Sequence, residues 1–310
     1  MFSHVDTRPL VSVIVPSYNH GRYIQKTIES ILNQSYGREN IELIVIDDCS
    51  KDNSANVIRS LSKKHGFTFH SNPRNKGVVK NLNTFLKMAH GKYIASCASD
   101  DYWHLDKLKD QVNLMESLGE DYAVCHTNAF VLNERSEEVY LHDGGKEFEG
   151  DIMPLILIKN AIVAPSTLIR KKVFTKVGYF DESMSFEDRE MWIRISLGYK
   201  FAHLDKVLVY RRQHLNNLSR NMNLWYESYS QIFEKYHERF VEFNLVQDYH
   251  YTMFTHMSGS NRKLSILHLV KSRTKLIQMG SLSALLKLFM PYWALKNNLA
   301  LRLKAYLHRW

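Results

Sequence analysis

The sequence predicts an α/β fold: a mostly parallel central sheet flanked by helices, followed by a helical C-terminal region. Short apolar runs rich in β-branched residues alternate with helical patterns along the first 120 residues or so, which is typical of buried parallel strands joined by crossover helices. Polar clusters directly follow three of these runs. With 310 residues, 45% of them hydrophobic and 24% charged, the composition is that of a globular protein and excludes a disordered chain.

The first strand is predicted at residues 10–16, Leu-Val-Ser-Val-Ile-Val-Pro, because a short, nearly continuous apolar run rich in β-branched residues indicates burial on both faces. A helix follows, since Ile24, Ile28 and Ile31 recur at helical spacing. The further elements predicted in chain order are a strand at 41–46, a helix capped by the polar loop 47–54, a strand at 67–70, a helix over 78–89 and a strand at 92–98.

The pattern changes after about residue 120. Shorter strands are predicted at 122–127, 166–170 and 201–210, with a loop rich in glycine and aspartate between the first two, and we interpret them as the second half of the same globule. Beyond residue 224 every segment has a helical pattern. The predicted divisions are therefore 1–118, 119–224 and 225–310.

The net charge of +9 resides entirely in the C-terminal region. Residues 249–310 hold ten Lys and Arg and no acidic residue, which leaves 31 basic against 32 acidic residues in 1–248. This region also carries apolar residues at helical spacing, Leu282, Leu285, Leu286, Phe289 and Trp293. Two interpretations stay open: contact with an anionic membrane surface, or a helical bundle packed on the main domain with a solvated basic face.

The expected location is a reducing cytoplasm. Three distant cysteines without a CxxC spacing exclude a disulfide scaffold, and no signal peptide or membrane-spanning segment is evident.

In a parallel sheet the ligand crevice lies outside the carboxyl ends of the strands, so the loops at 16–19, 47–48 and 100–101 are expected to meet at one edge. Asp48 can accept a hydrogen bond from a nucleobase, and Tyr18 can stack on its ring. Each residue taken alone also suits a simpler role, a turn-forming aspartate and a half-buried tyrosine.

Asp100 and Asp101 are adjacent carboxylates at a predicted strand end. Because they repel each other, they favour a bound cation, and their hard oxygen ligands suit Mg²⁺ or Mn²⁺ carrying a phosphate. Alternatively, Asp101 alone caps the helix that begins near His104.

Two later clusters complete the candidates. Glu187 and Asp188 precede an apolar helical pattern and supply a possible general base, although acidic residues in a solvated first helical turn are common. Arg211 and His214 follow an apolar strand and can meet a diphosphate or a metal ion, or form part of a basic surface.

The order and spacing of these motifs resemble the family 2 glycosyltransferases of GT-A fold. The motifs are Pro16-Ser17-Tyr18-Asn19, Val45-Ile46-Asp47-Asp48-Cys49-Ser50, Asn75-Lys76-Gly77, Asp100-Asp101-Tyr102-Trp103, Glu187-Asp188 and Tyr210-Arg211 with His214. The resemblance covers about residues 9–220. It implies that 1–118 bind a nucleotide sugar and that 119–224 form the acceptor and catalytic half.

The resemblance also implies individual roles. Pro16, Tyr18 and Asp48 would hold uracil and ribose, with Asn19, Asn75 and Gly77 near the nucleotide, Asp100 near the ribose or sugar, Asp101 on the metal, Asp188 as catalytic base beside Glu187, His214 near the metal or diphosphate, and Arg211 near the diphosphate. The motif reads Ser99-Asp100-Asp101 and not Asp-x-Asp, so which oxygen ligates the ion stays open.

The expected function is therefore inverting transfer of a hexose or N-acetylhexosamine from a UDP-sugar, with Mn²⁺ or Mg²⁺, to a glycan acceptor. The basic C-terminal region favours an acceptor at the inner face of the cell membrane, such as a saccharide linked to undecaprenyl diphosphate, in bacterial polysaccharide, O-antigen or capsule assembly. Two alternatives are a nucleotidyltransferase, although no glycine-rich phosphate loop follows the first strand, and a non-catalytic protein that binds anionic lipid or nucleic acid. The clustered acids of the core disfavour nucleic acid.

Overall fold

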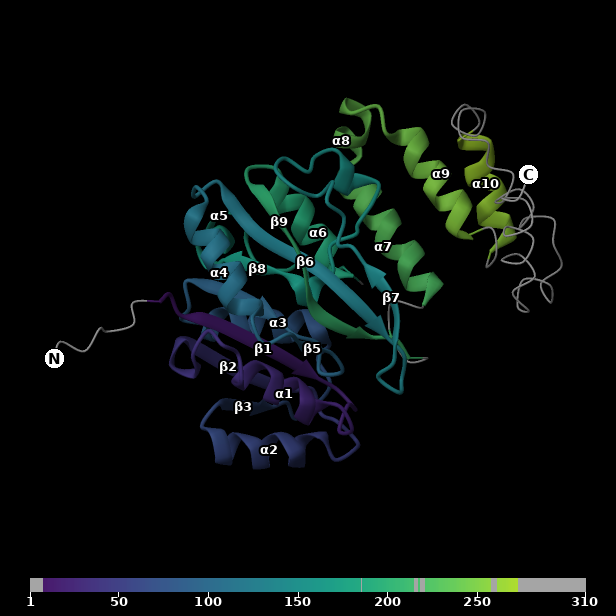
Figure 1. The fold of residues 1–310 in the computed structure, drawn as a ribbon. Helices are drawn as coiled ribbons and strands as arrows, with labels where there is room; N and C mark the ends of the chain where they lie inside the picture. Colours follow the sequence, from purple (N-terminus) through teal and green to yellow (C-terminus); the bar gives the residue numbers. More distant parts are fainter. Residues whose placement is uncertain (1–7, 185, 215–216, 218–220, 258–260, 273–310) are drawn as a thin grey trace. The chain divides into compact units, whose positions relative to one another are not determined.

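A computed structural model describes residues 8–184, 186–214, 217, 221–257 and 261–272 of the chain. The chain divides into two compact units, residues 1–216 and 217–310 (Figure 1). The first unit contains the whole sheet, and the described part of the second contains helices.

The first unit alternates strands and helices as the sequence predicts. Its strands are β1 (Val11–Ser17), β2 (Ile41–Asp47), β3 (Thr68–Ser71), β4 (Tyr93–Ser96), β5 (Tyr102–Trp103), β6 (Tyr122–Leu132), β7 (Glu138–His142), β8 (Leu168–Arg170) and β9 (Lys200–Arg212). Its helices are α1 (Ile24–Leu32), α2 (Ser54–His65), α3 (Val78–Met88), α4 (Lys107–Ser117), α5 (Phe174–Val177) and α6 (Glu187–Ser196), with 3₁₀ turns at Arg38–Asn40, Leu155–Leu157, Ala164–Ser166 and Lys171–Val173.

The strands form one sheet in the order β3-β2-β1-β4-β8-β6-β9-β5, with β7 paired to β6 (Figure 1). β1, β2, β3 and β4 are parallel neighbours, and β6 is parallel to β9. β8 joins these two groups and runs antiparallel to both β4 and β6. The α/β class and the sheet flanked by helices are confirmed, and the first four strands have the parallel arrangement that the apolar runs predict.

Burial on both faces of β1 explains its apolar run. Val11, Val13 and Val15 are fully buried in the core cluster that includes residues of α1, α2 and α4. Ile14 points to the opposite face, where it lines a small cavity together with residues of α3 and α6. The core therefore lies on both faces of the parallel strands, and the carboxyl edge of the sheet is left for polar loops.

Three features of the sheet were not predicted. β5 has only two residues, which is too short for an alternation of apolar and polar residues to identify it, whereas β8 falls within the strand predicted at 166–170. β7 carries Val139, Tyr140 and Leu141, all well exposed, so burial does not shape its sequence. The antiparallel direction of β8 depends on pairing with strands far away in the chain.

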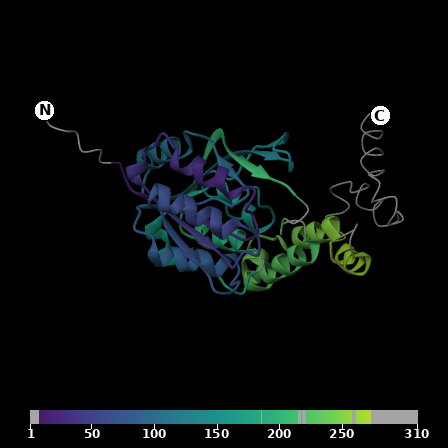
Figure 2. The same cartoon turned by 90° about the horizontal axis from the view of Figure 1, so that it is seen from below.

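The described part of the second unit consists of α7 (Met222–Lys235), α8 (His237–Glu242), α9 (Val246–Met257) and α10 (Arg262–Lys271), in agreement with the helical pattern beyond residue 224 (Figure 2). Phe233 of α7 stacks on Tyr249 of α9, with ring centroids 3.9 Å apart. Within the described ranges, we find no helix with the length and hydropathy needed to cross a bilayer. The amphipathic pattern at 282–293 lies outside the described residues.

Candidate functional site

The polar loops after β1, β2 and β4 lie at one edge of the sheet, because β1 lies between the other two strands and is parallel to both. Ser17 and Asp47, the last residues of β1 and β2, are partners in the ladder. The amide of Asp48 donates to the carbonyl of Ser17 at 2.8 Å, and the amide of Cys97 donates to the carbonyl of Ile14 at 2.9 Å. The three predicted loops therefore meet where the sequence placed them.

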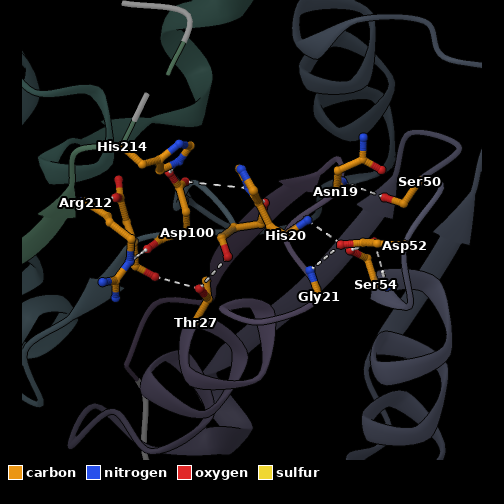
Figure 3. A network of polar contacts seen from close by, with 12 residues as sticks. Asn19, His20, Gly21, Thr27, Ser50, Asp52, Ser54, Asp100, Arg212 and His214 are labelled. Atoms are coloured by element: carbon orange, nitrogen blue, oxygen red, sulfur yellow. Dashed lines mark hydrogen bonds and ion pairs between the residues drawn. The ribbon is translucent and has the colours of Figure 1, made fainter. Parts of the chain in front are cut away.

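Hydrogen bonds lock the loop after β1 to the loop after β2 (Figure 3). Three successive amides donate to side chains of the second loop: Asn19 N to Ser50 Oγ at 2.9 Å, His20 N to Ser54 Oγ at 3.0 Å and Gly21 N to Asp52 Oδ2 at 2.9 Å. In return Asn19 Oδ1 accepts from the amide of Lys51 at 2.7 Å. Asn19, predicted to lie near the nucleotide, thus uses its side-chain oxygen to hold the two loops together.

Asp48 organises a third segment, residues 72–77. Its Oδ1 accepts from Asn72 Nδ2 at 3.0 Å and from the amide of Lys76 at 2.8 Å, while its Oδ2 accepts from the amide of Gly77 at 2.8 Å. Gly77 has a φ of +85° in this segment, a backbone conformation that favours glycine. The structure therefore brings Asp48, Asn75 and Gly77 together, but both Asp48 oxygens already bind protein groups.

Tyr18 and Pro16 flank this arrangement. The Tyr18 side chain is 43% exposed beyond the end of β1, which leaves its ring accessible for stacking. Pro16 is partly buried within β1, opposite Ile46 of β2. The position of Tyr18 agrees with the predicted contact to a nucleobase, which itself stays a prediction.

His20, Asp100 and His214 form a group that can hold a metal ion (Figure 3). One potential ligand atom of each residue lies within 4.8 Å of those of the other two. His214 Nε2 is 3.0 Å from Asp100 Oδ2, and His20 Nδ1 is 3.8 Å from Asp100 Oδ1. Burial lowers the pKa of His20, against the opposing charge of Asp100, which favours the neutral imidazole that ligates metals.

The donor set fits a divalent transition ion. Two imidazole nitrogens and one carboxylate suit a first-row transition ion better than Mg²⁺, which prefers a shell of oxygen ligands, and among the two expected ions they favour Mn²⁺. His20 was not among the predicted site residues. Its only signal in the sequence was its position next to Asn19, because a single histidine in a loop has no spacing that marks it as a ligand.

Asp101, predicted as the metal ligand, has another role in the structure. Its Oδ1 accepts from the amide of Arg212 at 2.7 Å, and its own carbonyl accepts from Thr27 Oγ1 at 2.6 Å. Burial and the neighbouring charge of Asp100 raise the pKa of the Asp101 carboxyl well above its usual range. The described group that can hold a metal contains Asp100 and not Asp101, so we propose Asp100 as a ligand, and the ligand role of Asp101 stays a prediction.

Arg212 clamps the loop that carries both aspartates. Its Nε donates to the carbonyl of Asp100 at 3.1 Å, and its Nη1 donates to the carbonyl of Asn133 at 3.1 Å and to Ser136 Oγ at 2.9 Å. The guanidinium also lies 4.4 Å from the ring centroid of Tyr23. Arg212 thus joins the loop after β4 to the turn between β6 and β7.

Replacing Arg212 with lysine is expected to destabilise the protein by about 2–3 kcal/mol. The lysine ammonium cannot reach in several directions as the planar guanidinium does, so it leaves some of the buried acceptors of Arg212 without a donor. Thermal unfolding will measure this loss. Arg22→Ala is the matched control, since Arg22 also lies over the Tyr23 ring and donates to Glu134 of the same turn, whereas the bond to the Asp100 carbonyl comes from Arg212. Equal losses in the two variants would contradict the clamp.

Glu187 and Asp188 begin α6 and line a small cavity with Ile14 of β1 and Ser96 of β4. Burial, with the charge of Asp188 added, raises the pKa of Glu187 to about 7. Burial also raises the pKa of Asp188, whose Oδ1 accepts from the amide of Arg189 at 2.6 Å. Both carboxyls are therefore better proton acceptors than exposed ones.

Arg211 links the two acidic clusters electrostatically. Its positive charge opposes the rise in the pKa of both Asp101 and Asp188, so it acts on carboxyls at the end of β4 and at the start of α6. The structure therefore gathers candidates from both halves of the first unit around this edge of the sheet.

Known proteins similar to this chain include glycosyltransferases. Residues 12–178 match the model of the family described as Glycosyl transferase family 2. The chain is 32% identical over 216 residues, covering 68% of the chain and 80% of the relative, to the Escherichia coli UDP-Glc:alpha-D-GlcNAc-diphosphoundecaprenol beta-1,3-glucosyltransferase WfaP. It is 30% identical over 232 residues, 70% of each chain, to an uncharacterised glycosyltransferase of Rickettsia prowazekii.

Solved structures show the same fold. Staphylococcus aureus TarS 1–349 in complex with UDP-GlcNAc superposes with a TM-score of 0.59 at 19% identity, covering 93% of this chain and 91% of TarS. The mannosyltransferase PcManGT of Pyrobaculum calidifontis, in complex with GDP-Man and Mn²⁺, has a TM-score of 0.62 at 18% identity and covers 98% and 88% of the two chains.

Proposed function

Since the chain belongs to glycosyltransferase family 2, we propose that it transfers a hexose or N-acetylhexosamine from a UDP-sugar to a hydroxyl of a glycan acceptor, with inversion at the anomeric carbon. The observation that carries this proposal is the group of His20, Asp100 and His214 beside the loops after β1 and β2. This arrangement provides a cation site next to an exposed aromatic ring, which suits a nucleoside diphosphate.

The proposed reaction is a single displacement, in which each candidate residue has its own role. Tyr18 stacks on the base of the donor, and His20, Asp100 and His214 hold a divalent cation. That cation supplies positive charge against the charge that develops on the departing diphosphate. Arg211 adds a further positive charge near the same carboxyls.

Asp188 takes the proton of the acceptor hydroxyl as the oxygen attacks. Its raised pKa makes the carboxylate a stronger base than an exposed aspartate, which helps it to remove a proton from a hydroxyl. The burial that raises this pKa also limits access of water. Glu187 lies beside it with a pKa of about 7 and shares the small cavity below the helix start.

The proposed acceptor is a saccharide carried on a lipid diphosphate, in bacterial polysaccharide assembly at the inner face of the cell membrane. WfaP, whose name specifies such an acceptor, supports the lipid-linked saccharide. The Bacillus subtilis putative teichuronic acid biosynthesis glycosyltransferase TuaG, 38% identical over 109 residues and 35% of this chain, supports a role in polysaccharide assembly. The basic C-terminal region provides the electrostatic attraction to an anionic membrane.

A panel of UDP-sugars tests the proposed function. The purified full chain is expected to release UDP from one of UDP-Glc, UDP-Gal, UDP-GlcNAc or UDP-GalNAc when a lipid-diphosphate-linked GlcNAc acceptor is present, and faster with Mn²⁺ than with Mg²⁺. NMR of the product reports the anomeric configuration. Release of sugar 1-phosphate in place of UDP, with transfer of UMP to the acceptor, would instead identify a nucleotidyltransferase.

Deleting residues 273–310 is expected to weaken binding to vesicles of phosphatidylglycerol at least about tenfold, because this segment holds seven Lys and Arg and no acidic residue and each cation contributes about 1 kcal/mol near an anionic surface. Vesicle co-sedimentation measures the loss. Vesicles of neutral phosphatidylcholine serve as the control, and undiminished binding to the anionic vesicles would end the membrane proposal.

A further inference from the structure

A second, larger cavity lies at the other end of β4. Its volume is about 490 Å³, and Gly91 and Lys92, which precede β4, contribute to its lining, whereas Asp100 follows that strand. A volume of this size falls within the range of small-molecule sites, about 300–1,000 Å³. This cavity is separate from the candidate site, because no residue assigned to the donor, the metal or the base lines it.

The walls of the cavity are largely apolar. Leu86 of α3, Phe174 of α5 and the exposed Tyr179 line it. Arg170 forms part of the wall but is itself buried, and it donates to the carbonyl of Tyr122 at 2.8 Å and to the hydroxyl of Tyr93 at 3.0 Å. Arg170 therefore serves chiefly as a structural cation, and the walls suit an apolar ligand.

Three lysines, Lys92, Lys171 and Lys172, add positive charge to the same lining. Lys92 pairs with Glu116 at 2.7 Å, Lys172 pairs with Glu120, and Lys171 donates to the carbonyl of Ala89. Together with Arg170, four cations face two carboxylates, so the cavity keeps an excess of two positive charges. About half of the Lys92 and Lys172 side chains is exposed, which leaves ammonium donors accessible to a ligand.

We propose that this cavity binds a phosphate monoester that carries a single apolar chain. A phosphate monoester brings a charge of about −1.5 to −2 and three acceptor oxygens, which match the two excess positive charges and the lysine donors. The apolar chain covers Leu86, Phe174 and Tyr179. Free phosphate leaves these walls in water, and a neutral amphiphile leaves the excess charge uncompensated.

Calorimetry with decyl phosphate on the full chain tests this proposal and does not depend on glycosyl transfer. Decyl phosphate is expected to bind at least about tenfold more tightly than either of two controls. Inorganic phosphate matches its head group alone, and decyltrimethylammonium matches its apolar chain alone. Saturating UDP is expected to leave the affinity unchanged, because the nucleotide is assigned to the opposite edge of the sheet. Competition by UDP, or equal binding of the cationic amphiphile, would overturn the proposal.

Two variants locate the site. Lys171→Gln combined with Lys172→Gln removes head-group charge and is expected to weaken decyl phosphate at least about tenfold. Thr175→Trp fills the cavity from a lining position and is expected to abolish binding while the charges remain. Lys176→Gln is the matched control, since Lys176 lies in the same helix but outside the lining, 5.6 Å from the Tyr199 ring centroid.

Thermal unfolding in the absence of ligand shows that each variant is folded. Loss of affinity in the first two variants with no change in Lys176→Gln supports the site. An unchanged affinity in the double lysine variant overturns the proposal, because binding would then not depend on these two charges. An equal loss in Lys176→Gln also overturns it, because binding would then reflect only the general charge of the surface.

Discussion

Replacing Asp188 with asparagine is expected to lower kcat by about 10²- to 10⁴-fold, the range lost when a positioned general base is removed. Asparagine keeps the size of the side chain and the oxygen that accepts from the amide of Arg189, but it cannot take the acceptor proton. Initial rates of UDP release under saturating donor and acceptor measure the change. The affinity for UDP is expected to stay largely the same, because the proposed donor contacts lie elsewhere.

Glu187→Gln is the matched control for Asp188→Asn. It removes the neighbouring acid from the same turn of α6 and the same small cavity, and it is expected to cost far less activity. If Glu187→Gln proved as damaging as Asp188→Asn, or if the latter kept full turnover, the assignment of the base to Asp188 would be wrong.

Asp188→Asn is also expected to stabilise the protein at neutral pH. Burial raises the pKa of Asp188 above its unfolded value, so the native state holds the proton more tightly and stability falls as the pH rises through the folded pKa. Asparagine avoids this cost. The stability difference from wild type should therefore shrink as the pH falls below the ordinary aspartate pKa of about 3.9.

Asp100→Asn is expected to weaken Mn²⁺ binding at least about 100-fold, because loss of outer-shell partners alone already costs 10- to 100-fold at metal sites. Asp101→Asn is the matched comparison. Asparagine at 101 still offers an oxygen to the amide of Arg212, so Mn²⁺ affinity should change little. Electron paramagnetic resonance of free Mn²⁺ in a titration without substrate separates the two carboxyls directly.

The reverse ranking would restore Asp101 as the ligand, and equal losses would indicate a shared site. Activity measurements are not needed for this comparison, so it holds whichever sugar the protein uses. His214→Ala should resemble Asp100→Asn, since its Nε2 lies 3.0 Å from Asp100 Oδ2.

The parallel half of the sheet was predictable because each strand carries its own evidence. The apolar run of β1 reports burial on both faces, and the polar residues that follow β1, β2 and β4 mark the edge at which ligands bind. Asp48 was recognised as important from its position at a strand end. Its contacts with Lys76 and Gly77 were not predictable, because they depend on how residues 72–77 return to the sheet.

The choice between Asp100 and Asp101 was beyond the sequence. Two adjacent carboxyls look equivalent in the chain, and which of them faces His214 is decided by β9, whose end brings the Arg212 amide to Asp101. His20 and Arg212 were missed for the same reason. Neither belongs to a periodic pattern, and each acquires its role only from segments at least 30 residues away.

The antiparallel strand β8 separates two parallel groups of strands, and this separation limits how a local change spreads between them. The loops that lock together after β1 and β2 make their bonds within the first 77 residues, while the turn between β6 and β7 belongs to the other group. A change in that turn can therefore leave the bonds between the first two loops intact. Arg212 bonds the carbonyls of both Asp100 and Asn133, so its side chain is a route by which such a change reaches the loop after β4.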